Sequence, residues 1–175
     1  FLPDNDIDDY TTIHPELLSI TTSREFIVKF GVKKPSLRDE IYNKILPTYD
    51  SDGDIDTEPH FKKFFRYFKE CRNEEVSEFI ALIKDKAFLE YKSPETDNVF
   101  RGEADDIYLP TVNLQTWFKP KTDTKFLLFD HYKSMVGESD VKQLIEFLRQ
   151  LGVSSFPRIK ETSEDRTIDG LTDLL

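Results

Sequence analysis

Four aspartates alternate along one polar stretch of the chain, and their spacing is the best candidate for metal chemistry. They are Asp50, Asp52, Asp54 and Asp56. Carboxylates at positions 1, 3, 5 and 7 are typical of a calcium-binding EF-hand loop, but position 6 is Ile55 where that loop needs glycine. Position 12 is Phe61 where a glutamate belongs. We therefore expect a solvated loop here, with a low-affinity cation site as the alternative.

A second acidic cluster lies just before a predicted strand, at Glu103, Asp105 and Asp106. Neighbouring carboxylates can hold a divalent metal ion for phosphoryl chemistry. The rival function for this chain is therefore a metal-dependent phosphohydrolase or nuclease that uses the acidic clusters at 50–56 or 103–106. No histidine lies near the second cluster in the sequence, so a charged turn is the simpler interpretation.

The other residue types that often carry chemistry lack the required spacing. His14, His60 and His131 are far apart in the sequence, and the glycines are too dispersed to form a phosphate-binding loop. Cys71 follows Phe68 on a predicted helix, which favours a small buried hydrophobe over a nucleophile. We expect no catalytic residue, no bound metal and no cofactor in this chain.

Trp117 and Phe118 are the candidate contact residues for a protein partner. Large aromatic side chains are enriched among the residues that dominate binding energy at protein interfaces. The same side chains also fill protein cores, so burial is the alternative for this pair.

Composition indicates a globular, acidic chain of 175 residues, of which 38% are hydrophobic. The length suits one ordinary domain. The formal net charge of −10 argues against nonspecific nucleic-acid binding, because phosphates would be repelled. We expect no membrane span and a cytoplasmic location, because no apolar run is long enough, no signal peptide is visible and there is one cysteine.

Capping patterns predict where two helices begin. Thr22 with Glu25, and Ser36 with Asp39, have the spacing of a capping box, in which each side chain bonds the other residue's backbone N–H. Pro47 is expected to end the second of these helices, because proline lacks a backbone donor and clashes with the preceding turn.

Apolar stripes predict three further helices. The first has its core face at Phe61, Phe64, Phe65 and Phe68, which fall at i, i+3, i+4 and i+7. The second is expected to be capped by Asn73 and has its face at Val76, Phe79, Ile80 and Ile83. The last has its face at Val141, Leu144, Ile145, Leu148 and Leu151. Between them, turn residues separate predicted strands at 88–92, 98–101, 106–109 and 125–129, with a short helix at 114–118.

One local pattern occurs twice, at 26–35 and at 147–157. Each copy is an apolar helical face that stops at a glycine, followed by valine and then by proline three or four residues after the valine. Glycine can adopt the left-handed conformation that closes a helix. We therefore predict positive φ at Gly31 and Gly152, and we interpret the chain as one repeat-like unit with parts of its neighbours.

Several of these segments together resemble a known family. The repeated Gly-Val boundary, the segments 88–92 and 106–110, and the run 126–129 resemble the internal region of large bacterial proteins with a sacsin-like, GHKL-type ATP-binding domain at their N-terminus. The resemblance covers about residues 23–159. It implies a non-catalytic spacer or client-contact segment of a chaperone-like or defence-related ATPase. The family's glycine-rich ATP-binding boxes have no counterpart here, so ATP and Mg²⁺ would belong to the parent protein.

Together these patterns predict an α+β fold, with about five or six helices packed on a small antiparallel sheet of three or four short strands. We expect residues 1–22 to be the tail of a preceding unit and residues 23–159 to form a single domain. Residues 160–175 are expected to be a polar C-terminal segment or the start of a further unit. The chain opens on Phe1, so we expect a piece of a longer protein. Its expected function is structural and protein-interacting, with other segments of the parent chain or client proteins as partners.

Overall fold

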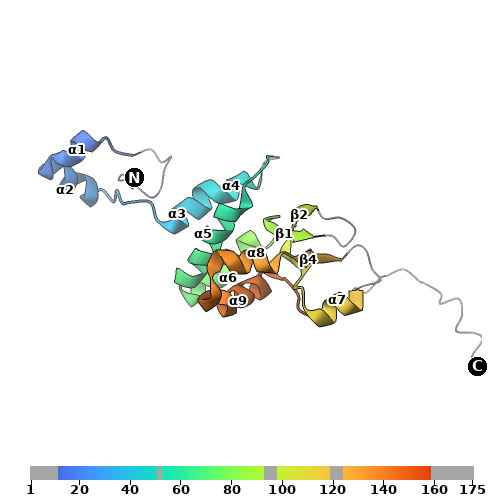
Figure 1. The fold of residues 1–175 in the computed structure, drawn as a ribbon. Coiled ribbons are helices and arrows are strands. Elements are labelled where there is room, and N and C mark those ends of the chain that lie inside the picture. The colour runs from blue at the N-terminus through green and yellow to red at the C-terminus, as the bar shows by residue number, and fades with distance from the viewer. Residues whose placement is uncertain (1–11, 51–52, 93–97, 119–123, 159–175) are drawn as a thin grey trace, which may run out of the picture.

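The computed structural model describes residues 12–50, 53–92, 98–118 and 124–158. Helices pack around a small four-stranded sheet, so the predicted α+β class is confirmed (Figure 1). The described residues hold more helical segments than predicted, because several are one-turn pieces too short to show a periodic pattern.

The first half of the described chain is helical, and the second half holds the sheet. The first-half elements are α1 (Pro15–Ser19), α2 (Thr21–Lys29), α3 (Leu37–Glu40), a π-helical turn (Ile41–Ile45), α4 (Leu46–Thr48), α5 (Thr57–Glu70) and α6 (Asn73–Ile83). The second-half elements are β1 (Leu89–Lys92), β2 (Val99–Gly102), a 3₁₀ turn (Ala104–Asp106), β3 (Ile107–Tyr108), α7 (Val112–Phe118), β4 (Lys125–Leu127), α8 (Phe129–Val136), a second 3₁₀ turn (Glu138–Asp140) and α9 (Val141–Leu151).

The sheet is mixed, which corrects the prediction that it would be antiparallel. Its strand order is β2-β1-β4-β3. β1 pairs antiparallel with β2 and with β4, whereas β3 and β4 run parallel, with Ile107 opposite Lys125. A parallel pair needs a crossover connection of a dozen residues or more, and residues 109–124, which contain α7, supply it.

Strand β4 is shorter than predicted. It ends at Leu127, and Phe129, which was predicted to be its last residue, begins α8. The Leu128 N–H donates to the Glu90 carbonyl (3.0 Å) as the chain leaves the sheet. Asp130 then lies in the first turn of α8, where the helix dipole favours a negative charge.

Only one of the three predicted helix caps is present. Ser36 and Asp39 form the capping box: the Ser36 N–H donates to Asp39 Oδ2 (2.8 Å) and the Asp39 N–H donates to Ser36 Oγ (3.1 Å). The other two predictions were wrong. α2 begins at Thr21 without a side-chain cap, so Thr22 lies inside the helix, and Asn73 is the first residue of α6. A cap contributes only about 1 kcal/mol, so it does not by itself decide where a helix begins.

Pro47 does not end its helix, contrary to the prediction. It lies within α4, and the helical run continues to Thr48. The five residues before α4, Ile41–Ile45, form a π-helical turn, after which the Leu46 N–H donates to the Ile41 carbonyl five residues earlier. A proline ring normally clashes with the carbonyl four residues before it, and the wider turn accommodates the ring.

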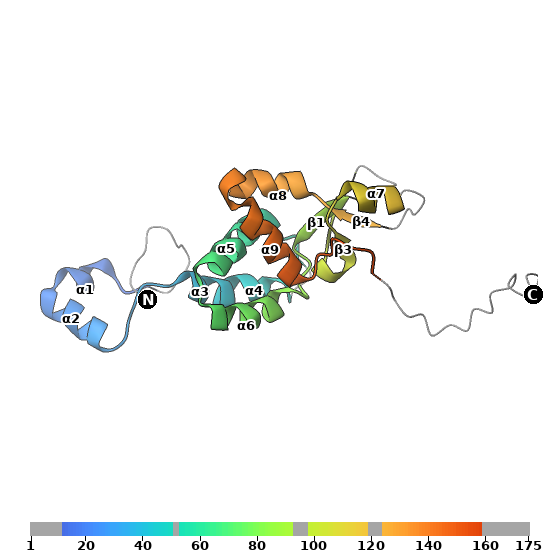
Figure 2. The ribbon, with the colours of Figure 1, turned by 90° about the horizontal axis from the view of Figure 1, so that it is seen from below.

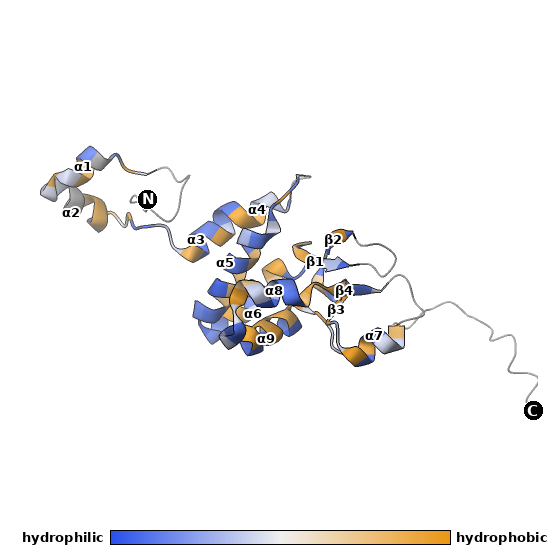
Figure 3. Ribbon diagram, in the orientation of Figure 1, coloured by the Kyte–Doolittle hydropathy of each residue, from blue (hydrophilic) through white to orange (hydrophobic). Residues whose placement is uncertain are grey.

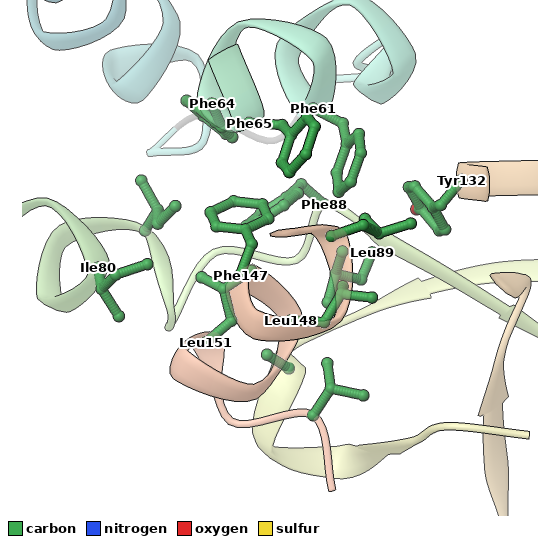
Figure 4. Packing of buried hydrophobic residues seen from close by; sticks show 14 of the residues in the cluster. Phe61, Phe64, Phe65, Ile80, Phe88, Leu89, Tyr132, Phe147, Leu148 and Leu151 are labelled. Atoms are coloured by element: carbon green, nitrogen blue, oxygen red, sulfur yellow. The ribbon is translucent and has the colours of Figure 1, made fainter. Parts of the chain in front are cut away.

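The predicted phenylalanine stripe of α5 lies at the centre of the core (Figure 4). Phe61, Phe64 and Phe65 are buried, and Phe68 is half-buried at the edge of the cluster. α9 packs across this stripe through Phe147, whose ring centroid lies 5.9 Å from that of Phe61. The stripe is therefore a core face, as predicted.

The α1–α2 hairpin lies apart from this core (Figures 1 and 2). Non-helical residues 32–36 connect it to α3, and the packed cluster begins with the half-buried Leu37 and the buried Ile41. Among the described residues the packed cluster therefore begins at Leu37, and the domain boundary at residue 23 stays a prediction. The predicted C-terminal segment 160–175 lies outside the described residues.

Gly31 and Gly152 close their helices in the same way, and both have positive φ as predicted (77° and 113°). The Val32 N–H donates to the carbonyl five residues earlier (3.3 Å), and the Val153 N–H makes the matching bond (2.9 Å). Each glycine N–H also donates to the carbonyl three residues before it, at 3.0 Å in both cases. This pair of bonds is the Schellman motif, a common way to end a helix, so the shared geometry by itself needs no repeat.

Replacing Phe65 with alanine should lower the free energy of unfolding by about 3–5 kcal/mol, because it leaves a cavity in a packed core. Phe65 is 4% exposed, and its ring stacks against that of Phe61. Urea denaturation followed by circular dichroism measures the loss. Phe26→Ala is the matched control, because it removes the same atoms from a ring that is 60% exposed, and should cost under about 1 kcal/mol. A loss of that smaller size for Phe65→Ala would contradict the assignment of α5 to the core.

Gly152→Ala should destabilise the protein more than Gly31→Ala. Both substitutions place a Cβ in a left-handed conformation, which costs about 1 kcal/mol or more. At Gly152 the new Cβ also collides with the Asp105 carboxylate, whereas nothing lies within 4 Å of one at Gly31. α9 belongs to the core, so we expect the urea assay to register a loss of about 1–2 kcal/mol for Gly152→Ala. The strain at Gly31 falls on a hairpin outside the core cluster, so unfolding of the body should register under about 0.5 kcal/mol of it. Equal losses would show that the two helix ends are equally important to the fold.

Candidate functional site

The acidic residues of segment 50–56 are directed to separate partners. Asp50 forms an ion pair with Lys86 (2.6 Å), and Asp54 forms one with Arg101 (3.0 Å). Asp56 caps α5, where its carboxylate accepts a hydrogen bond from the backbone N–H of the second helical residue (3.3 Å). Asp52 lies outside the described residues. The described carboxylates of this segment therefore neutralise basic side chains or cap a helix.

The second acidic cluster is also divided among different roles. Asp106 forms an ion pair with Lys125 (3.2 Å), which links the 3₁₀ turn to β4. Asp105 lies against Gly152 at the end of α9, and Glu103 precedes the 3₁₀ turn. Across the described ranges, no three His, Cys, Asp or Glu side chains gather in a way that could hold a metal ion.

The three histidines have separate roles. His14 caps α1, where its Nδ1 accepts from the Glu16 N–H (3.4 Å), and His131 Nε2 lies 3.7 Å from a carboxylate oxygen of Glu90. His60 Nδ1 lies 3.0 Å from the Tyr49 hydroxyl. Sequence spacing gave no ligand pattern for these residues, and the structure gives each a different partner.

The Tyr49–His60 pair is a partly buried polar contact against the core. Burial raises the pKa of Tyr49 and lowers the pKa of His60, because each charged form would lose its hydration. Both groups are therefore neutral near pH 7, joined by one hydrogen bond. Tyr49 also packs against the rings of Phe64 and Phe88, so the pair ties α4 and α5 together rather than facing a cleft.

The structure separates the two predicted partner-contact residues, Trp117 and Phe118. Phe118 is 8% exposed and packs against the rings of Tyr108 and Phe126. Trp117 is 66% exposed on the outer side of α7. Of the pair, only Trp117 is available to a partner.

A shallow apolar depression lies between α7 and α8. The larger hollow there has a volume of about 250 Å³, and a second of about 180 Å³ continues toward Ile145 of α9; Pro110 and Phe129 line both. Lys92, Asp130 and His131 are the titratable residues that line the larger one, and in the described chain no three His, Cys, Asp or Glu side chains gather there in a way that could hold a metal ion. The depression therefore has no arrangement that indicates a reaction.

The exposed large hydrophobic side chains of the described chain are most concentrated on the α1–α2 hairpin. Five of the eleven exposed large hydrophobic side chains are there, and all lie within one stretch of fourteen residues: Leu17, Ile20, Phe26, Val28 and Phe30. The end of α2 that leads into residues 32–36 is coloured as hydrophobic in Figure 3. Leu17, Phe26 and Ile27 also line an open hollow of about 440 Å³ between the two helices. Exposed apolar side chains that gather in this way are typical of interaction sites.

The apolar face of α2 repeats the pattern that α9 buries. Counted back from the closing glycine, positions 1, 4 and 5 are Phe30, Ile27 and Phe26 in α2, and Leu151, Leu148 and Phe147 in α9. The three residues of α9 are at most 1% exposed. In the hairpin, Phe26 is 60% exposed, Phe30 directly after α2 is 73% exposed, and Ile27 is half-buried. A face with core composition is therefore uncovered in this chain.

This surface was not predicted, because residues 23–159, which include most of α2, were expected to form a single domain. One signal was present: Phe26, Ile27 and Val28 are consecutive, so apolar side chains point to more than one side of the helix. A helix that is apolar on several sides is normally enclosed by other segments. The hairpin is not enclosed by the described body.

Comparisons of the chain with protein-family models, curated proteins and solved structures found no significant match. The resemblance to sacsin-like proteins therefore depends on the sequence patterns alone. In the described part of the chain, the helices are too short or too polar to cross a membrane.

The stability of the protein should fall between about pH 7.5 and 5.5, around the ordinary pKa of histidine, because of His60. Its pKa is lowered in the folded protein, so the unfolded chain takes up the proton at a higher pH. Protonation therefore favours unfolding, and the stabilisation that is present above the unfolded pKa is lost as the pH falls. Urea denaturation at the two pH values measures the change. His60→Gln should reduce this pH dependence, while His14→Gln, an exposed control, should leave it unchanged.

Proposed function

We propose that this chain is a non-catalytic, protein-interacting segment of a larger protein, and that the α1–α2 hairpin is its docking element. The observation that carries the proposal is the uncovered face of α2. Phe26 and Phe30 are exposed at positions whose counterparts α9 buries completely, on a hairpin that lies away from the body.

Burial of apolar surface favours a covered state for this face. Fully burying a phenylalanine side chain contributes about 1.5–3 kcal/mol, so covering the exposed parts of Phe26 and Phe30 is worth roughly 2–4 kcal/mol. This is a substantial part of the stability of a typical domain. A partner that also covers Leu17, which lines the same hollow as Phe26, gains still more, which makes the hairpin a favourable binding surface.

The surroundings of the acidic clusters favour this proposal over the rival metal-dependent phosphohydrolase or nuclease. Three of the described carboxylates that the rival needs are paired with Lys86, Arg101 and Lys125, a fourth caps α5, and Asp105 lies against Gly152. The resemblance to sacsin-like proteins adds a context, in which ATP and Mg²⁺ act elsewhere in the parent protein. The partners of this segment would then be unfolded clients or other parts of the parent chain.

The proposal predicts that the chain binds a permanently unfolded protein through the hairpin. Reduced and carboxymethylated lactalbumin, labelled with a fluorophore, is the probe, and fluorescence anisotropy measures its affinity. The double variant Phe26→Ser/Phe30→Ser should bind at least about tenfold more weakly. Val112→Ser is the control, because Val112 is 77% exposed on α7 and distant in sequence. Absence of binding, or equal binding by both variants, would remove the support for the hairpin as a docking element.

A further inference from the structure

We infer that the partner of the α2 face is the same face of a second copy of this chain, in an antiparallel pair of α2 helices. The inference rests on the proposed function in so far as it takes the hairpin to be the docking element, and it names the partner. It is carried by the aromatic pair on α2, by the charges beside that pair and by the position of the hairpin.

The centre of the contact is a pair of rings one helical turn apart. Phe26 and Phe30 lie on the same side of α2, with their ring centroids 4.4 Å apart. Together they expose on the order of 250 Å² of apolar surface, since a phenylalanine side chain buries about 150–250 Å² when fully covered. Two rings from each copy would form a four-ring cluster that excludes water from both faces at once.

The charges beside the rings fit an antiparallel pair. Glu25 and Lys29 are one turn apart and lie on one flank of the Phe26–Phe30 stripe, because successive helical residues are about 100° apart. Both side chains are exposed. A two-fold axis across an antiparallel pair brings Glu25 of one copy beside Lys29 of the other, and this contact occurs twice. A parallel pair would not bring these residues together, so the charge pattern selects the antiparallel arrangement.

The position of the hairpin leaves this face free to pair. It lies at one end of the molecule, beyond residues 32–36, and the groove that α9 fills in the body is occupied by α9 itself. A second copy therefore cannot accept α2 in that groove. Pairing of two hairpins needs no further component and covers both apolar faces.

The size of the contact predicts a weak dimer. The rings supply about a third of the 800 Å² that each partner buries in a standard interface, and Leu17, Ile20 and nearby polar side chains must supply the rest, because Val28 lies on the opposite side of the helix. We expect a dissociation constant on the order of 10–100 μM.

Sedimentation velocity over a concentration series tests the inference on the full chain. The chain should pass from monomer to dimer as its concentration rises, and Phe26→Ser/Phe30→Ser should remain monomeric. Val112→Ser should dimerise like the parent chain, because it removes an exposed apolar side chain from α7. A chain that stays monomeric throughout overturns the inference, and so does a dimer that survives the double substitution.

Charge exchange tests the antiparallel geometry. Glu25→Lys and Lys29→Glu should each weaken self-association by about tenfold or more, because each places like charges together at both contacts. An equimolar mixture of these two variants should recover the parent affinity, since opposite charges then meet at both contacts. A mixture that associates no better than the separate variants rules out this arrangement.

These outcomes are distinct from those of the client-binding assay. A monomeric chain that still binds the unfolded probe through Phe26 and Phe30 overturns the self-pairing and leaves the proposed function standing. A charge-dependent dimer that never binds the probe supports the self-pairing and removes the support for client binding by the hairpin.

Discussion

The fold depends on covering the aromatic stripe of α5 from several sides. Phe61 is at its centre, and its ring contacts Tyr132 of α8 (4.3 Å between centroids), Phe147 of α9 (5.9 Å) and Phe88 just before β1 (6.4 Å). One buried ring thus connects four parts of the chain that are far apart in sequence. Helices and sheet must meet around it, because leaving any side open would expose apolar surface to water.

Polar contacts at the edge of this cluster set the orientation of the covering elements. The Glu90 N–H donates to the Tyr132 hydroxyl (2.7 Å), which joins α8 to β1, and burial raises the pKa of that phenol. Arg158 donates to the carbonyls of Ile107 (3.1 Å) and Gly152 (2.5 Å), which holds the end of α9 against β3. The core of the body is therefore covered by segments of the body itself.

The hairpin is the exception to this closure, and it is where function is best sought. α2 and α9 have similar apolar faces and the same glycine-closed ends, yet only α9 lies in the core. A sequence pattern reports that a face excludes water, but it does not say whether the cover comes from the same chain or from another molecule. For that reason residues 23–159 were predicted as one domain, and the exposure of Phe26 and Phe30 is visible only in the structure.

The sequence by itself determined the features that depend on near neighbours: the α+β class, the capping box at Ser36, the left-handed glycines and the core stripe of α5. These follow from backbone geometry and side-chain periodicity within a few residues. Tertiary structure decided the parallel pairing of β3 with β4, the burial of Phe118 beside an exposed Trp117, and the separate ion pairs of the acidic residues. It also decided that α2 is uncovered. Each of these depends on which distant segments come together, because burial and charge pairing are set by contacts across the whole chain and not by local spacing.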